Sequence, residues 1–189
     1  QSNKQNNHIT MQQQQPRKKT SIIQSPIRLL ETLSTVSQDQ GNTPRPSRSI
    51  LLFIGGMQAL SKGDTSKTTE DKLSKALEEA EKSNENEELA SALLGIGYLY
   101  SFDSDQPAQV LRAIQSYKRS LDLWKLVHSA TSPKLIGLLG DLAALQQHQQ
   151  QKAEALASLN ECLVIYKSQG LDKPTNNDFV GLQDLINKL

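Results

Sequence analysis

From Ser47 onward, apolar side chains recur with a period close to 3.6 residues, and they nowhere alternate convincingly along the chain. This spacing places the apolar side chains on one face of an α-helix, so it predicts an all-α fold. The pattern is interrupted by the turn sequences "KGDTSKT", "KSNENEE", "DSDQP", "HSATSPK" and "SQGLDKPTNND". We therefore expect helices at about residues 48–62, 67–83, 87–102, 107–128, 133–148, 151–169 and 176–188. Because every connection is short, neighbouring helices are expected to pack antiparallel.

Composition agrees with helix packing and excludes several other classes of protein. Aromatic residues make up only 4% of the chain, so its core is expected to consist of Leu, Ile and Ala. A single cysteine, Cys162, excludes an internal disulfide framework and a cysteine-based zinc site, and it fits a reducing compartment. The longest apolar run, residues 50–60, is too short to span a bilayer and is expected to form a buried helix. The net charge of +1 gives no reason to expect a nucleic-acid partner.

Residues 1–46 differ in character from the helical part, residues 47–189. Nine of the first 15 residues are Gln or Asn, and residues 1–30 hold five basic and no acidic side chains. Such a segment buries too little apolar surface to offset the entropy of ordering, so we predict a basic, disordered tail and linker with one possible short helix at residues 26–37. The acid-free start also resembles an organellar transit peptide, so the expected location is intracellular, either cytoplasmic or in a mitochondrion or plastid. A third alternative is a phosphate or membrane-surface contact through Arg17, Lys18 and Lys19.

Two stretches of the helical part share one pattern of large and small residues. They are Ala113-Ile114-x-x-Tyr117-x-x-Ser120-Leu121-x-Leu123 and Ala155-Leu156-x-x-Leu159-x-x-Cys162-Leu163-x-Ile165. The helices before them also correspond, as Leu93-x-x-Ile96-Gly97-x-x-Tyr100 and Leu139-x-x-Leu142-Ala143-x-x-Gln146. Small side chains are required where two helices approach closely, and the large residue fills the groove beside them. We therefore expect the repeats to pack through Leu93, Gly97, Tyr100, Ala113, Tyr117, Ser120, Leu142, Ala143, Ala155, Leu159 and Cys162.

This pattern resembles the tetratricopeptide repeat. The small positions Ala80, Ser120 and Cys162 are 40 and 42 residues apart, a spacing similar to the longer repeats of kinesin light chains. The resemblance covers roughly residues 73–189 and, more loosely, residues 50–60. It implies an α-solenoid of about three helix-turn-helix repeats with a C-terminal capping helix. The insertion "SFDSDQP" departs from the pattern, and an irregular helical bundle is the alternative fold.

The resemblance also implies where a partner would bind, because the first helices of tetratricopeptide repeats line a concave face. The corresponding candidate partner-binding residues here are Phe53, Met57, Leu94, Tyr98, Asp141 and Gln147, accompanied by Ala144 and His148. A groove of this composition would suit an apolar or amphipathic peptide or helix. The alternative is that neighbouring helices or the tail cover these residues as core.

The predicted function is a non-catalytic protein-protein interaction adaptor or assembly module that binds a peptide or helix segment. One alternative is a structural accessory subunit of a large complex, possibly organellar, whose N-terminal tail becomes ordered on binding. Another is a regulatory subunit of an enzyme whose activity resides in another chain. Each of these alternatives predicts protein partners.

No motif indicates catalysis, a cofactor or a metal. His8, His128 and His148 lie far apart and are not spaced as ligands. The stretch "GGMQALSKGDTSKT" lacks the glycines of a phosphate-binding loop, and Cys162 falls at a packed small position that indicates core rather than a nucleophile. The polar run "QQHQQQ" is interpreted as the end of one helix and the turn at residues 147–151 into the next, not as a site.

Overall fold

The computed structural model describes residues 45–103 and 105–189, and within these ranges the chain is entirely helical, without a strand. The seven helices are α2 (Arg48–Ser61), α3 (Lys67–Ser83), α4 (Asn86–Ser101), α5 (Pro107–Val127), α6 (Leu135–His148), α7 (Lys152–Ser168) and α8 (Asn177–Lys188). The prediction of an all-α fold is therefore confirmed for the described residues. The predicted tail and its possible helix at residues 26–37 lie outside them.

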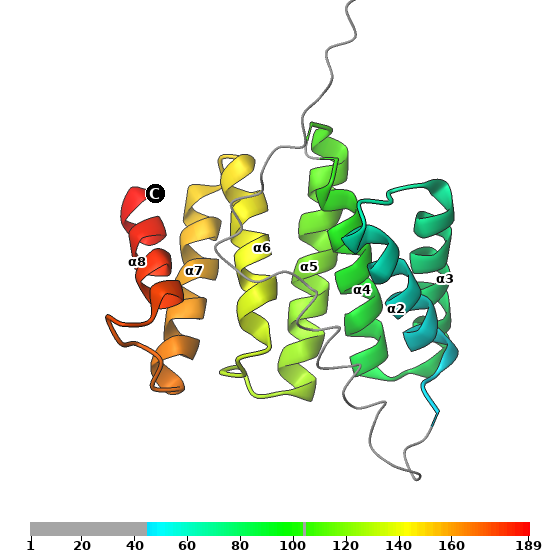
Figure 1. Ribbon diagram of the computed structural model, residues 1–189, viewed down its shortest axis with the longest axis horizontal. Coiled ribbons are helices and arrows are strands. Elements are labelled where there is room, and N and C mark those ends of the chain that lie inside the picture. Colours follow the sequence, from blue (N-terminus) through cyan, green and yellow to red (C-terminus); the bar gives the residue numbers. More distant parts are fainter. Residues whose placement is uncertain (1–44, 104) are drawn as a thin grey trace, which may run out of the picture.

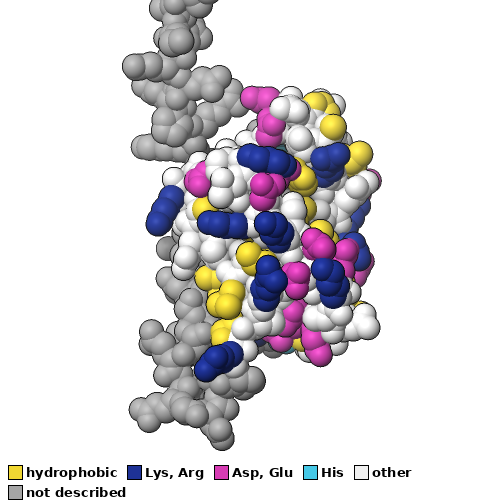
Figure 2. Space-filling view, turned by 90° about the vertical axis from the view of Figure 1, so that its right-hand side faces the viewer, with side chains coloured by type: hydrophobic (Ala, Val, Ile, Leu, Met, Phe, Trp, Pro, Cys, Tyr) yellow, Lys and Arg dark blue, Asp and Glu magenta, His cyan; other side chains and the backbone are white. Residues whose placement is uncertain are grey.

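The helices stand side by side in one row (Figure 1). The connecting loops alternate between the upper and lower ends of the row, so successive helices run antiparallel. Each helix packs against the next one in the sequence, and α2 also packs against α4. At the α3 end of the row, Lys and Arg side chains are interleaved with Asp and Glu side chains (Figure 2). On α3, Lys82 Nζ forms an ion pair with Glu78 Oε1 at 2.8 Å.

Two apolar clusters form the interior of the row. The smaller cluster joins α2, α3 and α4 through Phe53, Met57, Leu60, Leu73, Ala76, Ala80, Ala92, Ile96 and Leu99. The larger cluster extends from α4 to α8 and includes Leu94, Tyr117, Leu139, Leu159, Cys162 and Phe179. Helix α4 contributes to both clusters, and every residue from 90 to 97 is buried. Helix α4 therefore has apolar side chains all around it, as expected for a helix covered on more than one side.

Three of the helices end in the same left-handed turn. Their left-handed residues are Gly63 (φ 81°), Gln150 (φ 59°) and Gly170 (φ 65°), which follow α2, α6 and α7. Asn84 after α3 also has a positive φ, of 57°. In each of the three turns the next N–H group donates to a carbonyl five residues earlier, as from Gln151 N to Gln146 O at 2.8 Å. This is the Schellman arrangement, which satisfies carbonyls at a helix end and favours glycine at the left-handed position. The predicted turn at "QQHQQQ" is thus closed by a glutamine where the other two turns use glycine.

Replacing Gln150 by glycine is expected to raise the free energy of unfolding by about 0.5–1 kcal/mol, because glycine adopts the left-handed conformation without the steric cost of a Cβ. Urea denaturation of the full chain measures the change. The matched reverse variant is Gly63→Gln, which introduces the same cost in the equivalent turn where nothing lies within 4 Å of an added Cβ. A Gln150→Gly protein no more stable than the parent would contradict the prediction.

Candidate functional site

Helices α4 and α5 pack closely against each other. The ring of Tyr117 on α5 lies directly on the backbone of Gly97, where a Cβ would be 2.5 Å from the Tyr117 Cε1 atom. One turn further along α5, Ser120 Oγ donates a hydrogen bond to Ala90 O at 2.7 Å. Only small residues allow this approach, and the tyrosine ring fills the remaining space. The phenol of Tyr117 is buried near Tyr98 and Ser101 of α4 and Asp141 of α6.

The hydroxyl of Tyr117 is buried and has no hydrogen-bond partner in the part of the chain that the structure describes. Burial raises the pKa of Tyr117 well above its ordinary value, and the negative charge of Asp141 on α6 adds to the rise. The Ser101 hydroxyl lies near enough to lower this pKa slightly, but it does not meet hydrogen-bond geometry with Tyr117 and donates to Tyr98 O at 2.7 Å. The phenol is therefore a neutral polar group among Tyr98, Ser101 and Asp141.

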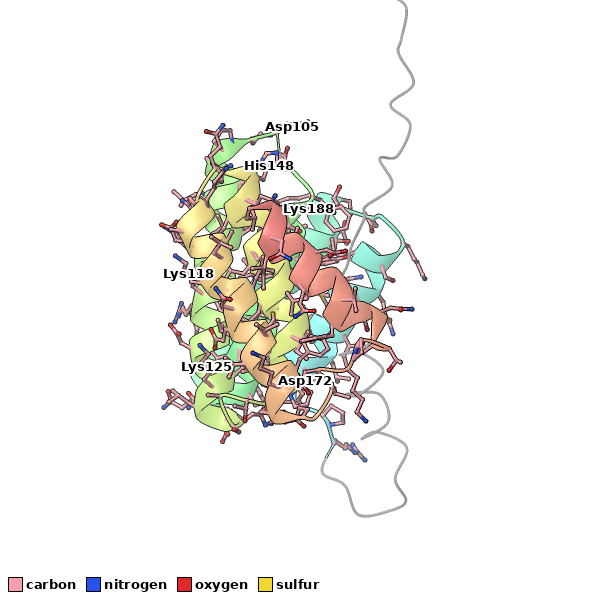
Figure 3. All side chains as sticks on the ribbon, turned by 90° about the vertical axis from the view of Figure 1, so that its left-hand side faces the viewer. Asp105, Lys118, Lys125, His148, Asp172 and Lys188 are labelled. Atoms are coloured by element: carbon pink, nitrogen blue, oxygen red, sulfur yellow. The ribbon has the colours of Figure 1, made fainter. Side chains whose placement is uncertain are left out.

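Near this hydroxyl, α4 and α6 carry several polar side chains that are half-buried or exposed. Tyr98 is half-buried, and its ring meets Phe102 edge-to-face at 5.2 Å between centroids. Asp141 is half-buried on α6, and Ala144, Gln147 and His148 of the same helix are exposed. Figure 3 labels His148 near one end of the helices. We call this set the α4–α6 surface, and it consists of Tyr98, Ser101, Asp141, Ala144, Gln147 and His148. Phenol, hydroxyl, carboxylate and amide groups can hydrogen-bond to the backbone of a bound peptide.

Three of the predicted groove residues do not lie on this surface. Phe53 and Met57 are each 1% exposed and Leu94 is 5% exposed, so all three belong to the apolar clusters. The expectation that they line an open groove is corrected by the packing, because α2 lies against α4 and the larger cluster encloses Leu94. Of the predicted partner-binding residues, only Tyr98, Asp141 and Gln147 are accessible.

The residues proposed for repeat packing are nearly all in the interior. Leu93, Gly97, Ala113, Tyr117, Ser120, Leu142, Ala143, Ala155, Leu159 and Cys162 are buried. Tyr100 is half-buried, with the guanidinium of Arg112 over its ring at 5.6 Å from the centroid. The periodicity did not predict a buried polar pair nearby, in which Ser158 Oγ donates to Gln146 Oε1 at 2.8 Å. Gln146 is thus an interior residue of α6 rather than part of the solvated turn.

The two histidines of the described ranges are separate from each other. The His128 ring stacks on Trp124 at 5.0 Å, and burial, followed by the positive charge of Lys134, lowers the pKa of His128. His148 is exposed near the end of α6.

Nowhere within residues 45–103 and 105–189 do three His, Cys, Asp or Glu side chains gather closely enough to hold a metal ion. Over the same ranges, the helices are too short or too polar to cross a membrane.

Cys162 is expected to react with thiol reagents at least about a hundredfold more slowly in the folded chain than in denaturant. Burial, followed by the charge of Glu161, raises the pKa of the Cys162 thiol to about 12, and the thiolate is the reactive form. Its Sγ lies 3.8 Å from Ile136 O in the interior. The rate of reaction with a disulfide reagent at pH 8 checks this, and the same chain in guanidinium chloride is the control. Rapid reaction of the folded chain with the disulfide reagent would contradict the burial of Cys162.

No protein-family model and no curated protein matches this sequence.

Proposed function

We propose that this chain is a non-catalytic interaction module, an adaptor or assembly subunit, that binds a peptide or helix segment of a partner at the α4–α6 surface. The hairpins α2–α3, α4–α5 and α6–α7 would act as tetratricopeptide-like repeats, with α8 as their cap. The observation that carries the proposal is the position of the Tyr117 phenol. It is a fully buried donor that has no hydrogen-bond partner among the described residues, and it lies near two half-buried polar side chains, Tyr98 and Asp141.

The row of antiparallel helices supports the same proposal. Helical hairpins that stack in sequence order expose long faces, and such faces bind extended or helical peptides. Tyrosine is among the residues that contribute most to protein interfaces, because its ring is rigid and its hydroxyl can hydrogen-bond. Tyr98 and Asp141 are accordingly the side chains expected to contribute most to binding.

The variants Tyr98→Ala and Asp141→Ala are expected to reduce recovery of a bound partner about tenfold or more, with little loss of helicity. The full chain, tagged and expressed in its source cells, is used for quantitative co-purification. The matched control is Lys118→Ala, which removes an exposed side chain at the outer edge of α5 (Figure 3). Circular dichroism of each variant separates loss of binding from loss of fold.

Equal recovery with Tyr98→Ala and Lys118→Ala would contradict a role for the α4–α6 surface. Unfolding of Tyr98→Ala would instead place Tyr98 in the core.

A second candidate function is a structural subunit of a large complex. It is favoured by the separation of charge along the chain, since residues 1–63 carry a net charge of +6 and residues 64–189 a net charge of −5. Recovery in one stable stoichiometric assembly would support the structural subunit, whereas a weak and exchangeable peptide ligand would support the adaptor.

A further inference from the structure

Charge is distributed unevenly over the helices around the α4–α6 surface. Helices α4 and α6 carry three acidic residues, Glu87, Glu88 and Asp141, and neither helix carries a Lys or Arg. Helices α5 and α7 together carry six basic and three acidic residues. Figure 3 shows two of these basic residues, Lys118 and Lys125, along one side of the molecule. A cationic ligand is therefore attracted to α4 and α6 rather than to α5 and α7.

The chain itself contains one segment of the opposite charge. Residues 16–30, "PRKKTSIIQSPIRLL", hold four basic residues and no acidic residue. They also hold five aliphatic residues, Ile22, Ile23, Ile27, Leu29 and Leu30. By contrast, nine of the first 15 residues are Gln or Asn, and residues 31–44 hold two acidic and no basic residues. Among residues 1–44, only residues 16–30 therefore combine positive charge with a group of aliphatic side chains.

The place where the described chain begins puts this segment within reach of the α4–α6 surface. Residues 31–44 connect it to Arg45, which lies three residues before α2. These 14 residues extend to at most about 45 Å. Helix α2 packs against α4, and packed helix axes lie about 8–10 Å apart. A segment tethered so closely is held at an effective concentration in the millimolar range, so even weak contacts are enough to keep it bound.

The side chains of the α4–α6 surface match both properties of residues 16–30. Asp141 is half-buried, so salt screens its charge less than that of an exposed carboxylate. The Tyr98 ring, which meets Phe102 edge-to-face, offers apolar surface to aliphatic side chains and an aromatic face to an arginine. A basic and aliphatic segment therefore fits this surface better than an acidic one.

We propose that residues 16–30 of the chain occupy its own α4–α6 surface when no partner is bound. The proposal deepens the proposed function, on which it rests, because it names what a partner has to displace. The four basic side chains of the segment are attracted by Asp141, and its aliphatic side chains contact Tyr98 and Ala144. A partner segment that competes for the same surface is expected to be basic and aliphatic too.

The test is paramagnetic NMR of the isotope-labelled full chain with a nitroxide attached at Ser21→Cys. Cys162 is buried, so the reagent reacts at the introduced cysteine, and the parent chain treated in the same way is the control. Because the segment binds within its own chain, we expect amides at residues 98–101 and 141–148 to lose at least about half of their signal intensity. Amides at residues 118–119, at the outer edge of α5, should keep theirs.

Variants with altered charge test what holds the segment in place. Replacing all four of its basic residues by glutamine is expected to restore most of the lost signal. The matched control replaces Gln12, Gln13, Gln14 and Gln15 by alanine, which alters four residues without altering charge and should restore none. Asp141→Asn should restore signal as well. Raising the ionic strength from about 0.1 M to about 1 M should act in the same direction, because the Debye length falls from about 10 Å to about 3 Å.

A mixture of two chains distinguishes binding within one chain from binding between copies. In it, one chain carries the isotope label and the other carries the nitroxide. Signal loss in the mixture equal to the loss within one chain would assign the segment to a second copy and overturn the proposal. Absence of signal loss, loss confined to other helices, or an unchanged loss in the glutamine variant would overturn it too.

Failure of this proposal is distinguishable from failure of the proposed function, because the NMR sample contains no partner. Signal loss at the α4–α6 surface, together with unchanged partner recovery by Tyr98→Ala, would contradict only the proposed function. Undiminished signals, together with reduced partner recovery by Tyr98→Ala, would contradict only the occupancy by residues 16–30.

Discussion

Replacing Tyr117 by alanine is expected to lower the free energy of unfolding by about 3–5 kcal/mol, one of the two largest effects that a single substitution should have here. The Tyr117 ring is 0% exposed and fills the space that Gly97 leaves between α4 and α5. Its removal leaves a cavity that the surrounding backbone cannot close. Urea denaturation of the full chain, followed by circular dichroism, measures the loss.

Two further variants separate the ring from the hydroxyl and test its contact with α4. Tyr117→Phe keeps the ring and removes a buried hydroxyl that has no partner among the described residues, so its stability is expected to equal or exceed that of the parent. Gly97→Ala is expected to cost about 1–3 kcal/mol in the parent chain, because its Cβ would strike the ring. In the Tyr117→Ala background that cost should vanish. Independent effects of the two substitutions would show that the ring and the glycine are not in contact.

Replacing Phe53 by alanine is also expected to cost about 3–5 kcal/mol. Phe53 is 1% exposed, and its ring lies so close to Gly95 that an added Cβ there would be 3.1 Å from the Phe53 Cδ2 atom. The matched control is Leu51→Ala on the same helix, because Leu51 is 57% exposed and its loss should cost less than about 0.5 kcal/mol. Thermal and urea unfolding of both variants measure the difference.

The Phe53 variant also decides between the two interpretations of this residue that the sequence permits. A core position predicts loss of stability whether or not a partner is present. A groove position predicts normal stability with weaker partner binding. A stable Phe53→Ala chain would therefore contradict its placement in the cluster between α2, α3 and α4.

The positions of the helices followed from the sequence because local chemistry determines them. Pro107 begins α5 as expected, and Gly170 follows α7 as a left-handed stop. The expected start of the helix at residue 133 was early, since α6 begins at Leu135 after a turn in which Leu135 N bonds to Ser132 O. Such errors of one or two residues occur at ends, where a turn and a helix share the same hydrogen bonds.

The candidate site was harder to predict, because it depends on which helices cover which faces. Periodicity marks Phe53 and Leu94 as apolar, but it cannot say that α3 and α4 cover Phe53 or that the larger cluster encloses Leu94. Gln146 and Gln147 are adjacent letters of one polar run, yet one is 2% exposed and hydrogen-bonded to Ser158 while the other is exposed.

Helix α4 has a further consequence, which concerns how the chain opens. In a row of repeats that meet only at their boundaries, an end repeat can detach while the others stay folded. Here α4 supplies side chains to both apolar clusters, and Tyr100 near its end packs against both. Separation of either half would expose a face of α4, so the two halves share one cooperative unit. Protection of backbone amides from exchange should therefore be greatest in α4 and decline toward α8.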